Sequence, residues 1–367
     1  MKKLSIPFLF FIFAISATSQ TLKNNHLSSL SYENRQKPNL YTSSIPVIGD
    51  ARAFFKYSDG TQGLVITKLT TWPGNGTLET AKPTITYFYR QINGQWVDIT
   101  SIVFDDRNSV PGCTHSRKTI AADFNQDGIV DFAIACTGWD DRPFPGERSR
   151  ILLSQPDGKW RLDYLSNTVA YQHAGASADI NGDGFPDLIL SNINGVDIFI
   201  NDGTGHFLKS TDLRIPQQRR GLIFELFDAN SDGKFDFIAG SHEWEDASRI
   251  IINPGNNNFG GSYFNRPMEI VIPAVSGAGV IVDFLYVQSK NVIYVLRTGD
   301  GKAAGTRFYE GVWLQKFDLT TRISSTVYAN PSWSEPGRPN NKWIRWIIER
   351  DGFITSDFGE LIKISID

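Results

Sequence analysis

Several residue types that mark common functional classes are scarce in this sequence. Its 367 residues include 2 cysteines and 5 histidines, and the formal net charge is −3. A chain without an excess of basic residues lacks the electrostatic signature of a nucleic-acid-binding protein. We therefore expect no nucleic acid among its partners.

Long apolar segments are also scarce. The longest, Leu4–Ile15, follows Lys2 and Lys3 and precedes the small residues Ala17 and Ser19. It is shorter than the roughly 20 residues that a membrane-spanning helix needs. The order of basic, apolar and small residues is that of a secretory signal peptide. An uncleaved membrane anchor is the alternative.

We accordingly expect a signal peptide over residues 1–19, a flexible segment over residues 20–39 and a single domain over residues 40–367. The mature protein would have no transmembrane segment and would be secreted, periplasmic or at the cell surface.

Two cysteines in an exported protein favour one disulfide, between Cys113 and Cys136. Two buried thiols are the alternative, because sequence spacing alone does not fix pairing.

The sequence does contain an internal repeat. Three segments share the pattern Asp-x-Asn-x-Asp-Gly-x-x-Asp, and they begin at Asp123, Asp179 and Asp228. An apolar strand and a turn rich in Gly, Asp, Asn or Pro follow each of them, as in a β-hairpin. One repeat then consists of about four short strands in roughly 50 residues, which is the size of a propeller blade.

The outer parts of the chain keep this rhythm but lose the acidic pattern. Residues 54–66 have Asp59 and Gly60 at the turn, residues 281–296 retain Asp283 as their first acid, and residues 343–366 form a shorter apolar unit. The sequence therefore predicts an all-β protein, a β-propeller with four-stranded antiparallel blades. Six blades fit best and seven are the alternative, with a strand near residues 40–47 closing the ring.

The acidic loops have the chemistry of a calcium site. Side-chain oxygens occupy positions 1, 3, 5 and 9, the glycine at position 6 permits a sharp turn, and the carbonyl at position 7 also faces inward. Ca²⁺ prefers such oxygen ligands, whereas Zn²⁺ prefers His or Cys. The alternative is that Asn, Asp and Gly simply form polar turns.

These loops resemble the FG-GAP or VCBS-type repeats of integrin α-subunit propellers and of many bacterial surface proteins. The resemblance implies a propeller with about three Ca²⁺ ions and no metal in the outer repeats. The implied ligands are Asp123, Asn125, Asp127, Ile129 and Asp131; Asp179, Asn181, Asp183, Phe185 and Asp187; and Asp228, Asn230, Asp232, Lys234 and Asp236, where Ile129, Phe185 and Lys234 use their carbonyls.

Two insertions rich in Trp and acids follow the first and third acidic loops. We expect them to lie at one end of the propeller and to bind an extracellular glycan or protein. The alternative is that each Trp packs on its own loop. The candidate ligand-binding residues are Trp139, Asp140, Asp141, His242, Glu243 and Trp244.

No complete catalytic motif is present: His242-Glu243 lacks the second His of a metalloprotease, and there is no Gly-x-Ser-x-Gly elbow. We therefore expect a non-catalytic, calcium-binding, ligand-binding module. The alternatives are a secreted propeller enzyme, either a polysaccharide lyase or a hydrolase, and a structural scaffold of a surface complex.

Overall fold

The structure is a computed structural model. It describes residues 51–104, 110–193, 195–211, 222–230, 235–242, 249–252, 268–334, 342–344, 347–350, 352–356 and 359–366. The expected signal peptide, flexible segment and closing strand lie outside these residues.

The described residues form six antiparallel sheets, numbered 1 to 6 along the chain. Each sheet joins strands that are consecutive in sequence, and sheet 6 has three strands where the others have four. The strands of sheets 1 to 3 are β1 (Arg52–Lys56), β2 (Gln62–Thr67), β3 (Thr86–Ile92), β4 (Gln95–Asp98), β5 (Ser116–Ala122), β6 (Asp131–Cys136), β7 (Arg150–Ser154), β8 (Trp160–Tyr164), β9 (Gly175–Ala178), β10 (Asp187–Asn192), β11 (Gly195–Asn201) and β12 (Phe207–Lys209). The strands of sheets 4 to 6 are β13 (Ile223–Phe227), β14 (Asp236–Gly240), β15 (Arg249–Ile252), β16 (Met268–Val271), β17 (Val280–Val287), β18 (Val292–Thr298), β19 (Val312–Asp318), β20 (Ser324–Asn330), β21 (Ile347–Arg350), β22 (Phe353–Ser356) and β23 (Gly359–Ser365).

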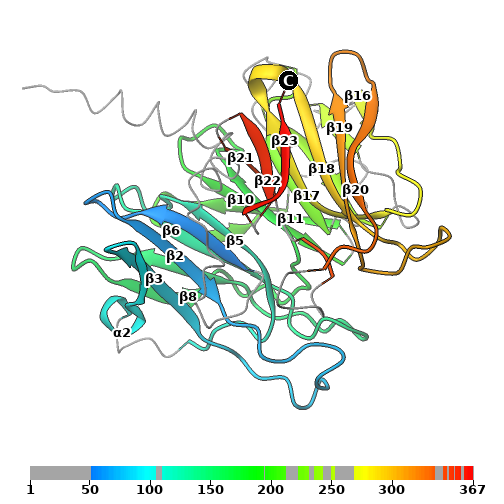
Figure 1. Ribbon diagram of the computed structural model, residues 1–367. Helices are drawn as coiled ribbons and strands as arrows, with labels where there is room; N and C mark the ends of the chain where they lie inside the picture. The colour runs from blue at the N-terminus through cyan, green and yellow to red at the C-terminus, as the bar shows by residue number, and fades with distance from the viewer. Residues whose placement is uncertain are drawn as a thin grey trace, which may run out of the picture.

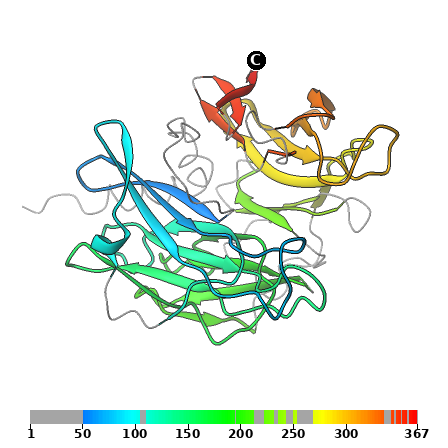
Figure 2. The ribbon, with the colours of Figure 1, turned by 60° about the horizontal axis from the view of Figure 1, so that its bottom comes forward.

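The sheets follow one another around a common centre. The first strand of each sheet contacts the first strand of the next, in the order β1, β5, β9, β13, β17 and β21. Figure 2 shows the same progression as an arc that runs from the blue sheet through the green sheets to the yellow and red ones. Radial sheets with neighbouring inner strands define a β-propeller, which confirms the predicted fold class. The choice between six and seven blades stays a prediction, because it also depends on residues outside the described part.

Packing between sheets explains the apolar strands. β6 is buried along its whole length, and so is β10 except for its last residue, because both faces of these sheets are covered. Between sheets 2 and 3, for example, Phe124, Leu188 and Phe199 share one core with no exposed surface. A strand covered on both sides reads as an apolar run rather than as an alternating pattern.

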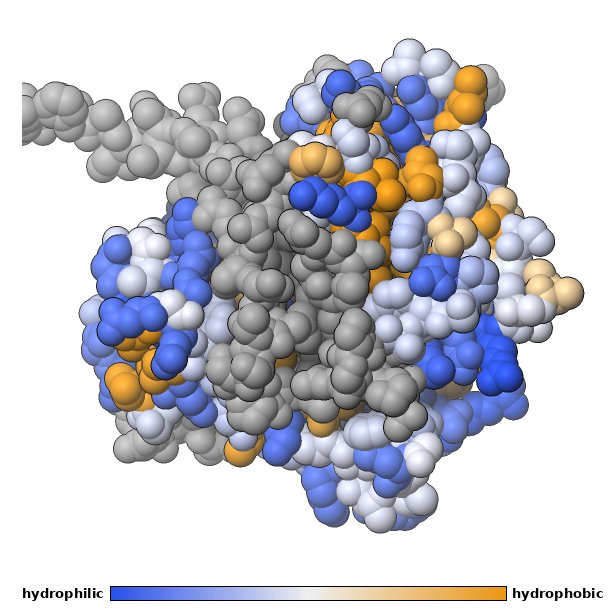
Figure 3. Space-filling model, viewed as in Figure 1, coloured by the Kyte–Doolittle hydropathy of each residue, from blue (hydrophilic) through white to orange (hydrophobic). Residues whose placement is uncertain are grey.

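Helical structure is minimal in the described residues, as the sequence predicts. It comprises α2 (Thr100–Val103) and the short 3₁₀ helix η2 (Gln288–Lys290). No helix in this part of the chain is long and apolar enough to cross a membrane. In Figure 3 apolar side chains gather over α2 and the adjoining strands of sheet 1, where Ile102 and Val97 are exposed.

The antiparallel order gives the propeller two distinct ends (Figure 1). The connections from first to second strand and from third to fourth strand lie at one end, here called the turn face. The connections from second to third strand, and from one sheet to the next, lie at the other end, here called the loop face. The three acidic segments join first and second strands, so they belong to the turn face.

A disulfide joins Cys113 to Cys136, with 5.6 Å between the Cα atoms. It ties the segment that leads into β5 to the end of β6, next to the loop of residues 137–149 on the loop face. The Glu147 carboxylate supports the same segment by accepting the backbone N–H of Thr114 at 2.7 Å. The base of this loop is therefore held by one covalent bond and one partly buried carboxylate.

Asp283 does not occupy the position in its blade that the alignment of the repeats predicted. Asp283 lies inside β17 beside a β-bulge, not at the start of a turn. Its buried carboxylate accepts the backbone N–H of Ile347 at 2.9 Å and so joins sheet 5 to sheet 6.

Candidate functional site

The first two acidic loops, residues 123–131 (loop 1) and 179–187 (loop 2), have the same internal geometry. The position 1 carboxylate reaches across each loop to the glycine at position 6: Asp123 accepts the N–H of Gly128 at 2.9 Å, and Asp179 accepts the N–H of Gly184 at 2.9 Å. Both glycines have positive φ, 86° and 96°, a conformation that is costly for residues with a Cβ. The glycine at position 6 therefore makes the sharp turn that the sequence predicts.

The side chains at positions 3 and 5 continue this pattern. In loop 1 the Asn125 side-chain oxygen accepts the N–H of Asp127 at 3.1 Å, and the equivalent distance in loop 2 is 3.0 Å. The position 5 carboxylate then accepts the N–H of position 7, at 2.8 Å in both loops. Oxygen atoms from positions 1, 3 and 5 thus line the inside of each loop.

The aspartate at position 9 has a second role that the sequence did not predict. Asp131, Asp187 and Asp236 have no exposed surface. Asp187 accepts the backbone N–H of Ile180 at 2.8 Å with one oxygen and that of Asn201 at 2.9 Å with the other. This carboxylate therefore clamps the start of its loop to the end of the third strand of the same sheet.

Burial has an electrostatic cost in these loops. It raises the pKa of Asp131 to about 6 and that of Asp187 to about 7. Burial also raises the pKa of Asp123, and the nearby Asp127 carboxylate adds to this effect. Clustered carboxylates with raised pKa values favour a bound cation, because the cation offsets both their desolvation and their mutual repulsion.

In the third loop, residues 228–236, the structure describes five of the nine residues. Asp236 accepts the N–H of Ala229 at 2.7 Å, which repeats the position 9 clamp. Asp232 and Lys234, two of the predicted ligands, lie outside the described residues.

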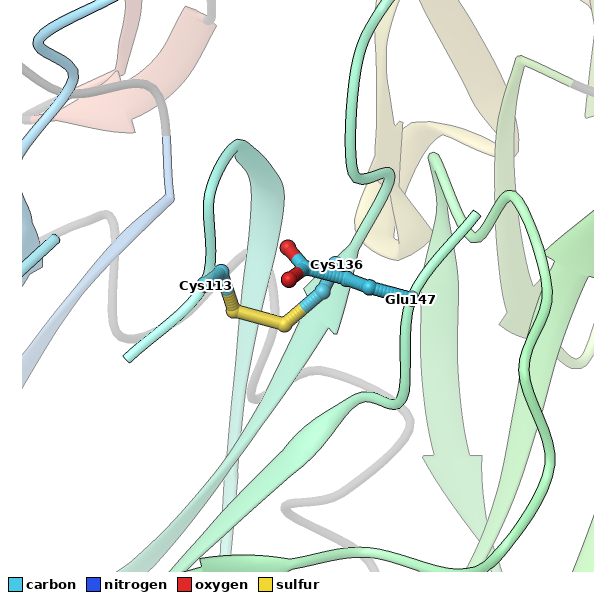
Figure 4. Close-up of side chains that lie close together, drawn as sticks. All are labelled: Cys113, Cys136 and Glu147. Carbon is cyan, nitrogen blue, oxygen red and sulfur yellow. A yellow bond between two sulfur atoms is a disulfide. The ribbon is translucent and has the colours of Figure 1, made fainter. Parts of the chain in front are cut away.

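Among the described residues, one group of side chains of the kinds that bind metal ions lies close together. Ligand atoms of Cys113, Cys136 and Glu147 lie within 4.8 Å of one another (Figure 4). Both sulfurs are bonded to each other, so they are not thiolate ligands. In the described residues of the acidic loops, no three carboxylates lie within 4.8 Å of one another. The suitability of these loops for Ca²⁺ therefore depends on the type of their oxygen ligands and on the turn that loops 1 and 2 share.

The loop face carries a second polar cluster, centred on Asp140. One of its carboxylate oxygens accepts a hydrogen bond from the Arg117 guanidinium and the other accepts one from the Tyr171 hydroxyl. The His115 imidazole lies 3.9 Å from the same carboxylate. Arg117 is the extra residue of a β-bulge in β5, and a bulge redirects a side chain in this way.

These contacts fix the protonation of the cluster. Burial raises the pKa of Asp140, but the charges of Arg117, His173 and His115 outweigh it and lower the pKa to about 2. Burial and the Asp140 carboxylate raise the pKa of Tyr171 well above its usual range. At neutral pH Asp140 is therefore ionised and Tyr171 is protonated.

A second ion pair spans the interior of the same face. Lys118, next to Arg117 on β5, lies with its Nζ 2.8 Å from a carboxylate oxygen of Glu225 on β13. These are the inner strands of sheets 2 and 4, so the pair reaches across the inner strand of sheet 3. The small residues of β9, Gly-Ala-Ser-Ala, have no long side chain in this region.

Aromatic side chains from the loop-face connections lie beside the Asp140 cluster and extend from it. In sheets 2 and 3 the Phe144 and Tyr171 ring centroids are 5.2 Å apart. In sheet 5 the Phe308 and Tyr309 centroids are 4.2 Å apart, and Tyr309 donates to or accepts from the His242 imidazole of sheet 4 at 3.1 Å. The aromatic band, as this set is called below, comprises Phe144, Tyr171, His173, His242, Phe308, Tyr309 and Trp343.

The two halves of the band are close to each other. The position of Tyr309 is one cause of the raised pKa of Tyr171, which places the two phenols within electrostatic reach. Phe308 is 50% exposed, so its ring is available for contact. The loop face therefore presents aromatic surface next to the Arg117–Asp140 ion pair.

For Trp139 the structure supports the packing alternative. Trp139 is 7% exposed, so its indole packs inside the protein and does not present a stacking surface. Asp140 belongs to the cluster, Asp141 is exposed at its edge, and His242 belongs to the aromatic band. Glu243 and Trp244 lie outside the described residues.

Sequence reasoning missed Tyr171 and Tyr309, among others. Neither belongs to a recognisable motif. The predicted topology could have identified them as residues of the loop face. Tyr171 precedes β9 and Tyr309 lies between β18 and β19, and both connections belong to that face.

The low pKa of Asp140 predicts a pH effect on stability. Its folded-state pKa, about 2, lies below its ordinary value of 3.8, so its stabilising contribution is present above about pH 4 and is lost as the pH falls towards 2. The full contribution corresponds to about 2 kcal/mol. Urea unfolding of the protein and of Asp140→Asn should differ by this amount at pH 6, and the difference should vanish near pH 2. A constant difference would contradict the assignment.

Comparison with known protein families confirms the repeat that the sequence predicts. Residues 123–190 and residues 179–239 each match the FG-GAP-like repeat family. No curated protein matches the chain.

Solved structures that are similar to this chain include a gluconolactonase, a galactosidase and a lectin. The periplasmic gluconolactonase of Pseudomonas aeruginosa is 12% identical, with 83% of this chain and 77% of that one covered and a TM-score of 0.46. A β-1,3-galactosidase with galactodeoxynojirimycin is 11% identical (77% and 94% covered, TM-score 0.40), and an Agrocybe aegerita lectin that recognises terminal N-acetylglucosamine is 17% identical (57% and 51% covered, TM-score 0.33). Because these identities and TM-scores are low, we assign the propeller fold from the order of the sheets in this chain.

Proposed function

Because residues 123–239 are FG-GAP-like repeats on a β-propeller, we propose that the protein is an exported, calcium-binding module that binds an extracellular ligand on its loop face. The observation that carries the proposal is the aromatic band beside the Arg117–Asp140 ion pair, with the Lys118–Glu225 pair on the neighbouring inner strands. Loops mounted on a rigid frame are the usual place for recognition.

Calcium has a structural role in this proposal. The side-chain oxygens of loops 1 and 2, and those of Asp228, Asn230 and Asp236 in the third, would hold the ion at the turn face. Extracellular calcium modules have Kd values of roughly 10⁻⁴ to 10⁻³ M, so each site would stabilise the fold by about 0.4–1.4 kcal/mol at about 1 mM Ca²⁺. The ion would support the blades at the end opposite to the ligand.

The protonation states favour binding over catalysis. A general acid or base works best with a pKa near the operating pH. Asp140 and Tyr171, the two hydrogen-bonded groups at the centre of the cluster, have pKa values displaced away from neutrality in opposite directions. They are therefore suited to hold fixed hydrogen bonds to a ligand.

The test is a binding screen with a matched pair of variants. Immobilised protein is exposed to a panel of glycans and extracellular proteins, and each hit is repeated with Tyr309→Ala and with Ile323→Ala. Ile323 is 66% exposed and precedes β20 in a hairpin of the turn face. We expect Tyr309→Ala to weaken binding roughly thirtyfold, as for an aromatic hot spot, and Ile323→Ala to leave it unchanged. Equal binding by both variants would contradict a ligand site on the loop face.

A further inference from the structure

Two ion pairs at the centre of the loop face match their charges, and this bears on the ligand that the proposed function would take. The Arg117 guanidinium is bonded to the Asp140 carboxylate, and the Lys118 ammonium lies 2.8 Å from the Glu225 carboxylate. All four side chains are at least three-quarters buried. Within the described residues, the centre of the face therefore offers two neutralised pairs.

A charged ligand meets a penalty at such a centre. An anionic group placed on Arg117 or Lys118 lies beside the carboxylate that already neutralises it, and a cationic group placed on Asp140 or Glu225 meets the partner cation. Taking a further charge out of water here is costly without a new opposite charge. A neutral polar group escapes both penalties and can still donate to the carboxylates or accept from the cations.

The aromatic band adds the second requirement. The exposed Phe308 ring packs against Tyr309, whose ring lies 5.6 Å from that of Trp343. Aromatic faces beside hydrogen-bonding groups suit a ligand with both an apolar face and hydroxyl groups. A pyranose ring has this combination, because its C–H bonds form a face and its hydroxyls form the rim.

Resting on the proposed function, we infer that the loop face binds an uncharged carbohydrate, with a sugar ring against Phe308 and Tyr309 and its hydroxyls on the Arg117–Asp140 and Lys118–Glu225 pairs. Within the described residues, the matched charges at this centre disfavour glycans that carry uronic acids or sulfates, and basic peptides.

The first test compares ligand charge. Uncharged polysaccharides (galactan, mannan, xyloglucan), acidic ones (polygalacturonate, alginate, heparin) and polylysine are offered to the intact mature protein at about 50 mM and about 500 mM NaCl. We expect binding to an uncharged glycan that changes less than twofold with salt, because salt screens only interactions between charges. Binding mainly to a charged polymer, with a steep loss in salt, would overturn the inference while leaving a loop-face ligand in place. If the protein binds none of these polymers, the inference is also overturned. The proposed function is then tested separately by the panel of extracellular proteins.

The second test changes the charge balance. Asp140→Asn removes the negative charge beside Arg117 and should raise affinity for polygalacturonate at least tenfold, whereas Asp202→Asn, a change at an exposed acid of the turn face, should not. Phe308→Ala should weaken binding of the uncharged glycan at least tenfold, with Ile323→Ala as its control. Thermal unfolding of each variant identifies any that does not fold, and Phe308→Leu, which keeps the apolar volume but loses the ring, then replaces Phe308→Ala. Uncharged-glycan binding unaffected by either Phe308 variant, or no gain of acidic binding in folded Asp140→Asn, would overturn the inference.

Discussion

Replacing Trp139 by Ala is expected to lower the free energy of unfolding by about 3–5 kcal/mol, the usual cost of truncating a buried large aromatic residue. The reason is its burial: only 7% of the side chain is exposed, although it lies in a loop with several charged residues. The change leaves a cavity that the disulfide-held base of the loop cannot easily collapse to fill. Urea unfolding monitored by circular dichroism measures the loss.

Trp72→Ala is the matched control, because Trp72 is 44% exposed in another loop of the same face. We expect it to change stability by no more than about 0.5–1 kcal/mol. If Trp139→Ala were as stable as the control and instead lost ligand binding, Trp139 would be a contact residue and its buried position in the structure would be wrong.

The second large effect concerns the position 9 clamp. Asp187→Ala is expected to lower the free energy of unfolding by about 3 kcal/mol or more, since it leaves the buried N–H groups of Ile180 and Asn201 without their acceptor and each costs about 1–3 kcal/mol. Unfolding in the presence of a chelator separates this loss from any loss of calcium. Asp187→Asn, which retains one carbonyl oxygen, should have an intermediate effect.

Asp202→Ala provides the control in the same sheet. Asp202 is exposed and accepts hydrogen bonds from Thr204 within a turn, so its loss should cost about 1 kcal/mol or less. A loss in Asp187→Ala that is no larger than this, with chelator present, would show that the carboxylate does not clamp the loop.

The fold could be predicted further from the sequence than the loop face could. The acidic loops are local: all their side chains lie within nine residues, so spacing alone indicates a turn, its glycine and its oxygen donors. The blade rhythm follows from the same repeats, because every sheet joins strands that are consecutive in sequence.

The loop-face cluster is not local. Tyr171 and Asp140 are 31 residues apart, and Lys118 and Glu225 are 107 residues apart, so only the side-by-side arrangement of successive sheets brings them together. The sequence left the choice between packing and exposure of Trp139 open for a related reason, since it shows a Trp among acids but not which side of the loop faces the core. The same limit applies to the buried position 9 aspartates, because one of the partners of Asp187 lies at the end of the neighbouring strand β11, 14 residues further along the chain.

The central claim is that the acidic loops are calcium sites, and direct titration of calcium tests it. Isothermal titration calorimetry of the mature protein, with native mass spectrometry for the stoichiometry, should give about three equivalents of Ca²⁺. Asp127→Ala and Asp183→Ala should each remove one, whereas Asp141→Ala on the loop face should remove none. No uptake of calcium by the folded wild-type protein, or the same uptake in all three variants, would contradict the account.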